Sequence, residues 1–315
     1  MGQSVLKSLS EKGFELIGAD SSSTAAGRFL ADSFEKVPKA SSPNYIQELS
    51  NICSKRGVDI LIPGLDAEVQ IIAEEVAGPD PHYLPKTVTQ TPAIVKIADD
   101  KLMTAEFLEM NGYPFPKTSN LEHGSLDKWF TFPAILKPKT GGARSIGVYR
   151  LAGLQDLERL RLSLPEGALD NYVIQEFVEG PEYTCGTLRF DGEFIGGIAM
   201  RRTLRSGDTH KAVVEKNHII LKHLRDVTQS LGTEGPCNFQ MKMNGATPYI
   251  FEINSRFSGT TAGRALAGFN EALYVVSRYL GLQVPKLEIR EVLVTRYWNE
   301  SATPVCDLEE DGIDF

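Results

Sequence analysis

Residues 235–256 read GPCNFQMKMNGATPYIFEINSR, in which apolar and polar side chains alternate on both sides of a short polar centre. The apolar members of this pattern are Phe239, Met241, Met243, Phe251 and Ile253. A period of two is typical of a strand that buries one face. Asn244 and Gly245 begin a turn and Pro248 ends it, which favours an antiparallel connection. The stretch is predicted to form a hairpin with one apolar and one polar face.

The length of the loop sets the pairing of the two predicted strands. If residues 244–248 form the loop, Met243 pairs with Tyr249. Because an antiparallel ladder continues residue by residue, the same register places Gln240 opposite Glu252. An amide and a carboxylate are therefore expected side by side on the polar face.

Further oxygen-bearing side chains are expected next to this pair. In the same register Asn238 lies opposite Asn254. Carboxylate and amide oxygens suit a hard cation such as Mg²⁺ or Mn²⁺, which takes its remaining ligands from water and a bound phosphate. The alternative is an ordinary antiparallel sheet that exposes one face to solvent.

The composition is that of a globular protein with about two domains. The chain has 315 residues, of which 42% are hydrophobic and 23% are charged, so fibrous and disordered classes are excluded. A net charge of -8 without a long Lys or Arg run argues against a nucleic-acid partner. The chain opens without a signal-peptide pattern and lacks a run of about 18 apolar residues, so no membrane partner is expected.

The four cysteines lack the spacing of a zinc site. They are Cys53, Cys185, Cys237 and Cys306. Scattered cysteines of this kind are interpreted as reduced thiols, which are typical of the cytoplasm. A cytoplasmic location is therefore expected.

The first 90 residues alternate helices with buried strands. Helices are expected at 2–12, 45–56 and 66–76, and strands at 14–20, 34–38 and 58–64. This order is typical of a doubly wound, Rossmann-like α/β half domain that lacks its first strand. Because that strand is usually central, the coding region is expected to extend upstream of Met1, and restoring the strand is expected to raise the melting temperature. A partner chain or a rearranged sheet is the alternative.

A second α/β segment follows a Pro-rich connector at 78–92. A helix is expected at 93–111, ended by Gly112. The order expected after it is strand 134–137, loop 139–147, strand 147–151, helix 153–163 and strand 172–178. The elements expected around the hairpin are an antiparallel segment at 182–216, helices at 217–231 and 260–281, and a strand near 292–298.

Lys137 ends the strand at 134–137, and a glycine-containing loop follows it. The loop KTGGARSIG spans residues 139–147. Glycines let backbone N–H groups approach a phosphate closely, and a lysine adds positive charge. The loop matches neither a P-loop nor a G-x-G-x-x-G motif, so a surface turn is the alternative interpretation.

The order of these motifs is more specific than any one of them. A helix that carries Lys101 precedes the Lys137 loop, QEFVEGPE (175–182) and the hairpin with its E-x-N-x-R run. This order resembles the ATP-grasp superfamily, and within it most closely the branch of the carbamoyl-phosphate synthase synthetase domains. The resemblance covers nearly the whole chain and implies an α/β fold with an α+β core. It divides the chain into a Rossmann-like pre-ATP-grasp domain (1–90), a linker helix (91–115), a lid (116–180), a catalytic core (181–300) and a C-terminal tail (301–315).

The resemblance also implies roles for individual residues. Those that would bind ATP are Lys101, Lys137, Gly141, Gly142, Ser145, Gly147, Glu176, Phe177, Val178 and Glu182. In this set the lysines and the loop hold phosphates, residues 176–178 face the adenine and Glu182 binds the ribose. The residues that would hold Mg²⁺ are Gln240, Glu252 and Asn254, and the catalytic residues would be Arg256 and Asn254.

The segment before the hairpin would line the cleft of such a protein. Its candidates for substrate binding, with one from the helix after the hairpin, are Arg202, His210, Lys211 and Arg264. A solvated basic edge is the alternative interpretation.

Two features depart from the usual ATP-grasp pattern. Most members have an acidic residue where Gln240 stands, although carbamoyl-phosphate synthase shares this glutamine, which lowers the ligand charge on one metal ion. The glycine loop carries Ala143 and Arg144 in its middle. A single ATP-grasp unit is also far shorter than the duplicated synthetase.

The implied function is that of an ADP-forming ligase. Such an enzyme uses ATP to convert a carboxylate to an acyl phosphate, and an amine then displaces the phosphate. Its partners would be small-molecule carboxylates and amines, and a homodimer is one expected assembly. Two alternatives stay open, namely phosphorylation of bicarbonate or carbamate as in carbamoyl-phosphate synthase, and a regulatory module that binds ATP without turnover.

Overall fold

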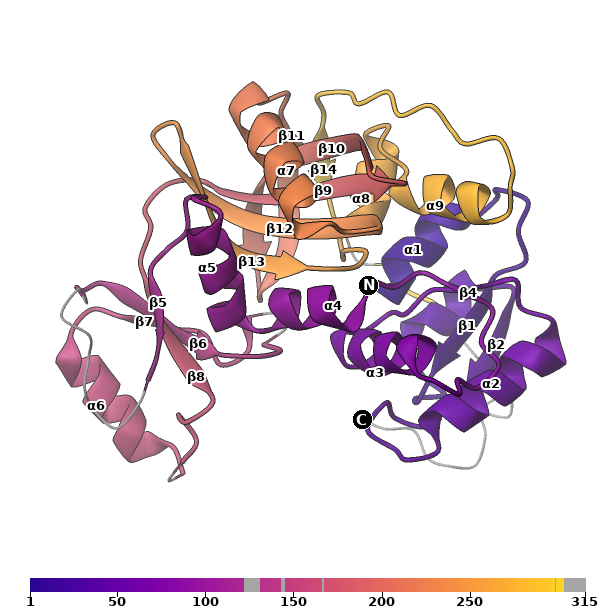
Figure 1. Ribbon diagram of the computed structural model, residues 1–315, viewed down its shortest axis with the longest axis horizontal. Helices are drawn as coiled ribbons and strands as arrows, with labels where there is room; N and C mark the ends of the chain where they lie inside the picture. The colour runs from indigo at the N-terminus through magenta and orange to yellow at the C-terminus, as the bar shows by residue number, and fades with distance from the viewer. Residues whose placement is uncertain (122–130, 143–144, 166, 298, 303–315) are drawn as a thin grey trace.

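The structure, a computed structural model, describes residues 1–121, 131–142, 145–165, 167–297 and 299–302. Ala143 and Arg144 of the glycine loop, Cys306, and most of the expected C-terminal tail lie outside this described part. The described elements form an N-terminal group, a small four-stranded group and a six-stranded sheet that lies between them (Figure 1). The six-stranded sheet carries the predicted hairpin.

This central sheet is antiparallel throughout, with the strand order β13-β12-β9-β10-β11-β14. Its strands are β9 (Glu182–Phe190), β10 (Glu193–Arg205), β11 (Asp208–Val214), β12 (Gly235–Asn244), β13 (Thr247–Asn254) and β14 (Leu293–Thr295). The predicted antiparallel segment and the predicted hairpin are confirmed.

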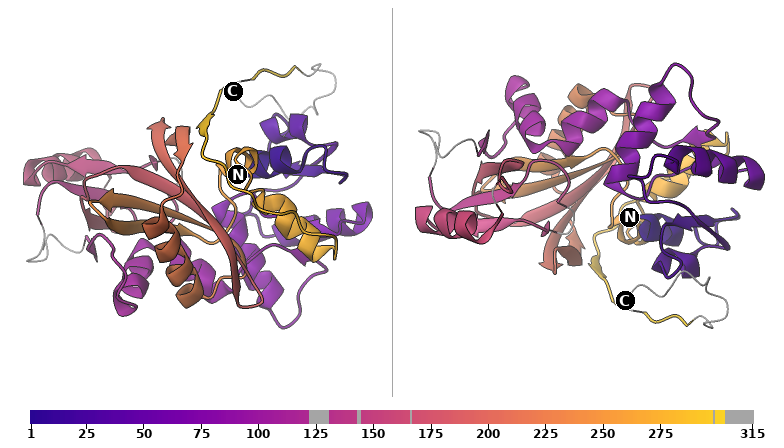
Figure 2. Two further views of the ribbon diagram at one scale, coloured as in Figure 1. Left: turned by 90° about the horizontal axis from the view of Figure 1, so that it is seen from above. Right: turned by 90° about the horizontal axis from the view of Figure 1, so that it is seen from below.

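Helices cover both faces of the central sheet (Figure 1, Figure 2). The helices in contact with it are α1 (Gly2–Leu9), α4 (Pro92–Asp99), α5 (Lys101–Met110), α7 (His218–Leu231) and α9 (Glu271–Tyr279). Cys185 and Phe239 point to α4, α5 and α7, whereas Leu188 and Met200 point to α1 and α9. Since side chains alternate along a strand, the second face also carries Gln240, at the end that these helices leave uncovered. That end is polar and holds the candidate site.

The hairpin brings its polar side chains together in the predicted register. Gln240 pairs with Glu252, and Asn238 pairs with Asn254. Asn238 is buried, whereas the other three are partly exposed. The amide and carboxylate groups therefore lie next to each other at the uncovered end of the sheet.

Near the turn the predicted register is wrong. Met243 pairs with Pro248 instead of Tyr249, because the turn consists only of residues 245–246. A β-bulge between this part and the Gln240 pair absorbs the extra residue, Phe251. The bulge restores the predicted register for the polar pairs, so the error stays local.

The N-terminal group consists of two separate two-stranded parallel sheets and the helices around them. Its strands are β1 (Ile17–Asp20), β2 (Ser33–Lys36), β3 (Ile60–Leu61) and β4 (Lys86–Thr87), and its further helices are η1 (Ala26–Leu30), α2 (Tyr45–Arg56) and α3 (Asp66–Ala77). β1 pairs with β2 and β3 pairs with β4, but within the described residues no ladder joins β1 to β3. β4 lies in the connector where no strand was predicted. The expected upstream strand stays a prediction.

The small group contains a four-stranded antiparallel sheet in the order β5-β8-β6-β7. Its elements are β5 (Thr118–Asn120), β6 (Ala134–Pro138), β7 (Tyr149–Leu151), α6 (Leu154–Ser163) and β8 (Tyr172–Glu176). Leu157 of α6 packs with Leu136 and Ile174 in a core of its own. β5 was not predicted.

Two predicted helices are each broken in the structure. The expected helix at 93–111 consists of α4 and α5, because Asp100 accepts hydrogen bonds from the N–H groups of Leu102 and Met103 and starts a new helix. This cap places Lys101 in the first turn of α5.

No helix in the described part of the chain has both the length and the apolar surface needed to cross a membrane.

The expected helix at 260–281 consists of α8 (Thr261–Leu266) and α9. Gly268 lies between them with a φ of +92°, and a Cβ at this position would overlap the carbonyl oxygen of Glu288. Asn270 then caps α9 by accepting a hydrogen bond from the N–H of Leu273. The glycine conformation and the new cap together break the helix.

A fully buried ion pair joins α8 to α9 beneath the polar end of the sheet. Arg264 and Glu271 have no exposed surface, and Arg264 Nη1 donates to Glu271 Oε1 at 2.9 Å. Arg264 Nη2 also donates to Asn238 Oδ1 at 2.5 Å, and Thr261 Oγ1 donates to Glu271 Oε1 at 2.6 Å. Arg264 was expected to bind substrate, but the structure places it in the core, where it supports the hairpin.

The substitution Glu271→Gln would leave the Arg264 guanidinium buried without a counter-charge. We expect the free energy of unfolding to fall by about 3–5 kcal/mol, the range for breaking a buried pair. The free energy of unfolding is measured by urea denaturation, with circular dichroism as the signal. Glu288→Gln is the control, because it removes only an exposed ion pair with Lys286 and should leave the free energy of unfolding nearly unchanged. Equal effects of the two substitutions would contradict a role of the buried pair in stability.

Candidate active site

Three side chains of β12 and β13 form a hydrogen-bonded row on the polar end of the central sheet. Gln240 Nε2 donates to Glu252 Oε1 at 3.0 Å, and Asn254 Nδ2 donates to the same oxygen at 2.9 Å. Among the described residues no group donates to the other oxygen, Glu252 Oε2. The two amides therefore fix the orientation of the carboxylate and leave one of its oxygens available.

Arg202 of β10 extends this row toward β9. Its Nε and Nη2 donate to Glu182 Oε1 at 2.9 and 2.7 Å, and Nη2 also donates to Gln240 Oε1 at 2.7 Å. Lys242 Nζ lies 3.1 Å from the other oxygen of Glu182. Arg202, which was expected to meet substrate, thus holds two other predicted site residues. A glutamine suits position 240, because its amide oxygen accepts from this guanidinium while its Nε2 donates to Glu252.

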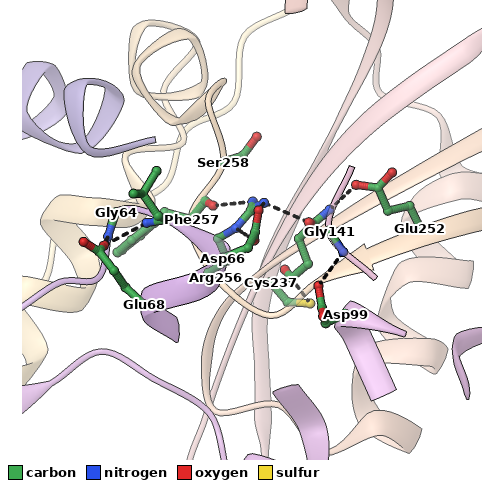
Figure 3. A network of polar contacts seen from close by, with 12 residues as sticks. Gly64, Asp66, Glu68, Asp99, Gly141, Cys237, Glu252, Arg256, Phe257 and Ser258 are labelled. Carbon is green, nitrogen blue, oxygen red and sulfur yellow. Dashed lines mark hydrogen bonds and ion pairs between the residues drawn. The ribbon is translucent and has the colours of Figure 1, made fainter. Parts of the chain in front are cut away.

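Arg256 ends the row at the other side, where the hairpin meets the N-terminal group (Figure 3). Its Nη2 donates to Asn254 Oδ1 at 2.8 Å, and its Nη1 donates to the carbonyl oxygen of Phe257 at 2.9 Å. Its Nε and Nη2 donate to the two carboxylate oxygens of Asp66 at 2.5 and 2.8 Å. The row therefore continues from Glu182 through the hairpin to the first residue of α3.

The two predicted lysines lie on the side of the glycine loop. Lys137 Nζ donates to Gln175 Oε1 at 2.8 Å and to the carbonyl oxygen of Phe251 at 3.0 Å. Lys101 Nζ donates to the carbonyl oxygen of Gly141 at 2.7 Å. Burial lowers the pKa of Lys137 to about 7; the charge of Glu252 raises it and that of Lys101 lowers it further. An arriving anion would favour the charged form of this lysine.

A small pocket that is open to solvent gathers several of these groups. Its polar lining includes Asp66 of α3, Asp99 of α4, Gly141 of the glycine loop and residues 252–256 of the hairpin. Asp99 Oδ1 accepts a hydrogen bond from the N–H of Gly141 at 3.2 Å, which attaches the start of the loop to α4. The structure thus brings four predicted residues, Gly141, Glu252, Asn254 and Arg256, into one cavity.

The described part of the glycine loop has the backbone conformation that glycine permits. Gly141, Gly142 and Gly147 have φ values of +65°, +81° and +73°. Ser145 also has a positive φ of 58°. Side chains larger than hydrogen would strain this backbone, so the glycines serve the loop shape. Contact of the loop with phosphate stays a prediction.

The residues expected near adenine lie at the end of β8. Glu176 Oε2 accepts a hydrogen bond from the N–H of Lys117 at 3.2 Å. The Phe177 ring lies under the guanidinium of Arg150, 4.5 Å from Cζ to the ring centroid, and Val178 is buried. Their contact with adenine stays a prediction.

His210 and Lys211 lie on β11, apart from the row of polar side chains. Lys211 pairs with Thr295 of β14 and is exposed, and the carbonyl oxygen of His210 accepts from the N–H of Arg296. Neither residue lines the pocket. Their role in substrate binding stays a prediction without support from the pocket geometry.

Two residues of the pocket, Asp66 and Asp99, were missed by the sequence reasoning. Asp66 begins the helix directly after β3, and ligands of α/β proteins often bind at the carboxyl ends of parallel strands. That rule could have identified Asp66. Asp99 ends α4, and nothing in its local sequence distinguishes it from a solvated carboxylate.

The donor set fits a magnesium ion that is bound together with a nucleotide. Within the described residues no three His, Cys, Asp or Glu side chains gather as a metal site. Mg²⁺ commonly takes one or two carboxylates and completes its shell with water and phosphate. Glu252 offers one oxygen, whereas the oxygens of Gln240 and Asn254 already accept hydrogen bonds from Arg202 and Arg256. A site with one carboxylate fits this geometry better than a fully protein-bound ion.

Solved structures with the same arrangement of elements cover almost the whole chain. L-amino acid ligase from Bacillus licheniformis has a TM-score of 0.69 at 17% identity and covers 91% of this chain and 74% of that chain. N5-carboxyaminoimidazole synthetase from Staphylococcus aureus, complexed with ADP, has a TM-score of 0.70 at 16% identity. The match covers 91% of this chain and 77% of that chain. Residues 168–300 match the family described as "ATP-grasp in the biosynthetic pathway with Ter operon". The chain is an ATP-grasp protein.

Two further comparisons also concern this ATP-grasp protein. Residues 2–78 match the family described as "PylC-like, N-terminal domain". The carbamoyl phosphate synthase large chain of Clostridium acetobutylicum is 27% identical over 240 residues, which cover 69% of this chain and 20% of that protein. The ATP-grasp protein thus spans about a fifth of the length of this relative. The predicted superfamily and fold class, with a Rossmann-like N-terminal domain, are confirmed.

The lowered pKa of Lys137 predicts a pH-dependent stability. In the unfolded chain Lys137 keeps its proton up to about pH 10.5, whereas in the folded protein it loses the proton near pH 7. Between these values the unfolded state binds more protons, so the contribution of Lys137 to the free energy of unfolding rises with pH. Thermal melting between about pH 6.5 and 9 should show the wild type gaining stability relative to Lys137→Met. Lys211→Met, at an exposed lysine, is the control.

A stability difference between wild type and Lys137→Met that stays constant over this range would contradict the prediction. It would show that Lys137 keeps its proton in the folded state. The Lys211→Met control makes the same replacement at a lysine that is exposed on β11.

Proposed function

We propose that this ATP-grasp protein is an ADP-forming ligase that joins a carboxylate to an amine through an acyl phosphate. The observation that carries the proposal is the available oxygen of Glu252 in a pocket that also contains Arg256 and Gly141. A carboxylate that holds a metal–nucleotide complex, a guanidinium and a glycine loop are the groups that phosphoryl transfer requires. The likeness to an L-amino acid ligase supports this reaction class.

ATP would bind with its phosphates between the lysines and the hairpin. Lys101 Nζ donates to the carbonyl oxygen of Gly141 in the glycine loop, and Lys137 Nζ donates to the carbonyl oxygen of Phe251. A phosphate oxygen can accept from either ammonium group, in place of the carbonyl oxygen or in addition to it. Because the pKa of Lys137 is about 7 without ligand, phosphate binding would restore its full charge. Glu182, held by Arg202, would face the ribose.

Groups on the hairpin would stabilise the negative charge of the transferring phosphoryl group. Mg²⁺, when bound, neutralises the phosphates and polarises the phosphorus–oxygen bond. Glu252 would hold it through Oε2, while Gln240 and Asn254 keep the carboxylate oriented. Arg256 would donate to the γ-phosphate oxygens as negative charge develops there.

The proposed reaction proceeds in two steps. A carboxylate oxygen of the first substrate attacks the γ-phosphorus of ATP, the new oxygen–phosphorus bond forms, and the bond to ADP breaks. The nitrogen of a neutral amine then attacks the acyl carbon, inorganic phosphate leaves, and the amine loses a proton. The protein contributes positioning and charge stabilisation, so no Ser, Cys or His nucleophile is needed.

A second candidate is phosphorylation of bicarbonate or carbamate. The sequence similarity to the carbamoyl phosphate synthase large chain favours this alternative, as does Gln240 in place of an acidic residue. Both reactions use the same phosphoryl-transfer groups. They differ in the acceptor, so the substrate screen separates them.

The experiment that tests the proposal is a screen for ADP release. The protein is incubated with Mg²⁺ and ATP, first with pairs of L-amino acids and small carboxylic acids, and separately with bicarbonate with and without ammonia. Mass spectrometry identifies the product. ADP release that requires both a carboxylate and an amine supports the ligase, and release that requires bicarbonate supports the alternative. Tight ATP binding without ADP release under any condition would identify a non-catalytic nucleotide-binding module.

Glu252→Gln is predicted to abolish most turnover. The substitution keeps the size of the side chain but removes the charge that would hold Mg²⁺, so kcat for ADP release should fall by about 100-fold or more. The melting temperature should change little, because the side chain is partly exposed. Glu193→Gln, at an exposed carboxylate on β10, is the control. A kcat for Glu252→Gln close to that of the control would overturn the metal assignment.

A further inference from the structure

A bidentate ion pair connects the N-terminal group with the end of the hairpin. Asp66 is the first residue of α3 and Arg256 follows β13, so the two are 190 residues apart in the sequence. Asp66 accepts from Nε of Arg256 with one oxygen and from Nη2 with the other, at 2.5 and 2.8 Å. Two parallel hydrogen bonds fix the plane of a guanidinium, which a single contact does not.

The hydrogen bonds of Arg256 leave it one available donor. A guanidinium has five N–H groups. The described residues accept from one N–H on Nε, from one on Nη1 and from two on Nη2. The remaining N–H is on Nη1. Arg256 therefore has a fixed orientation and a single direction in which it can donate to a ligand.

The loop that carries Asp66 is itself braced. Glu68 Oε2 accepts hydrogen bonds from the N–H groups of Gly64 and Leu65 at 2.8 and 3.0 Å (Figure 3). Asp66 follows these two residues directly, at the N-terminus of α3, where the helix dipole stabilises a carboxylate. The segment PGLDAE (63–68) thus holds the carboxylate of Asp66 at a fixed place beside the pocket.

We propose that Asp66 is a positioning residue for the phosphoryl-transfer step. It holds Arg256 so that the remaining N–H on Nη1 meets the γ-phosphate without a search for the correct rotamer. This inference rests on the proposed function, and it gives the N-terminal group a part in the chemistry of the central sheet. An arginine held before substrate arrives loses its conformational entropy in advance, which lowers the barrier of the chemical step.

A purely structural bridge makes different predictions from a positioning residue. A bridge that only attaches the N-terminal group would change the melting temperature and leave the turnover of the folded protein unaltered. A positioning residue changes kcat more than KM, because its effect is realised in the transition state. The two roles are therefore separable by kinetics.

The kinetic test uses Asp66→Asn, which keeps the shape but replaces one charged acceptor oxygen with an N–H donor. With Mg²⁺, ATP and a mixture of the standard L-amino acids, kcat for ADP release should fall about 10- to 100-fold while KM for ATP changes little. Asp66→Glu should recover part of the loss. Glu74→Gln, at an exposed carboxylate on the same helix, should match the wild type. A kcat for Asp66→Asn within about twofold of wild type would overturn the inference.

A double mutant tests whether Asp66 acts through Arg256. In an Arg256→Met background the substitution Asp66→Asn should cause no further loss of kcat, because the group that Asp66 positions is already absent. If the losses of the two single variants multiply in the double variant, Asp66 acts independently of Arg256 and the inference is wrong.

An NMR measurement tests the positioning without any turnover. The Nε–H signal of Arg256, identified by its loss in Arg256→Met, should exchange slowly with water in the wild type and at least about tenfold faster in Asp66→Asn, because the bidentate partner is gone. Glu74→Gln should leave the signal unchanged. If the wild type releases no ADP, the proposed function fails, and this signal alone decides whether Asp66 holds Arg256. An exchange rate that is the same in wild type and Asp66→Asn would refute the inference.

Discussion

The antiparallel pairing of β12 with β13 is the constraint on which the rest of the site depends. It places Gln240 beside Glu252, and both amides of the row then donate to the same carboxylate oxygen. Because the side-chain period of a strand is two, a slip by one residue would turn Glu252 toward the apolar face that packs on α7. The apolar side chains of Phe239 and Met241 prevent this slip, since both are fully buried. Packing on one face of the sheet therefore fixes the chemistry on the other.

Most charges of the site are paired before any ligand arrives. Arg202 holds Glu182, and Arg256 holds Asp66, so two guanidiniums and two carboxylates are oriented by each other. Lys137 differs, because burial lowers its pKa and its two hydrogen bonds go to neutral oxygens. Fixed dipoles and charges need little reorganisation when negative charge develops, which is the usual source of electrostatic catalysis. The arrangement suits an anionic ligand that enters between the lysines and the hairpin.

Sequence patterns predicted the elements well where periodicity and caps agree. Residues 45–56 form α2 with the predicted bounds, because an αL glycine at position 57 ends the helix. The break between α4 and α5 was missed, although Asp100 has the side chain of a helix cap, because the apolar pattern continues across it. The β-bulge at Phe251 was missed as well, since an extra residue changes the pairing without changing the alternation of the sequence. Such errors concern local geometry, and the order of the elements survives them.

By itself the sequence determined the hairpin and the superfamily, because these follow from short-range alternation and from the order of motifs. The predicted pairing of Gln240 with Glu252 is correct because the β-bulge compensates for a turn that is shorter than predicted. Only the tertiary structure decided which charged residues are free to act. Arg264 is buried against Glu271, and Arg256 is held by a carboxylate 190 residues away. A sequence gives the charge of a side chain but not its partner or its burial. Those depend on how distant segments pack, and here that packing places the N-terminal group beside the site.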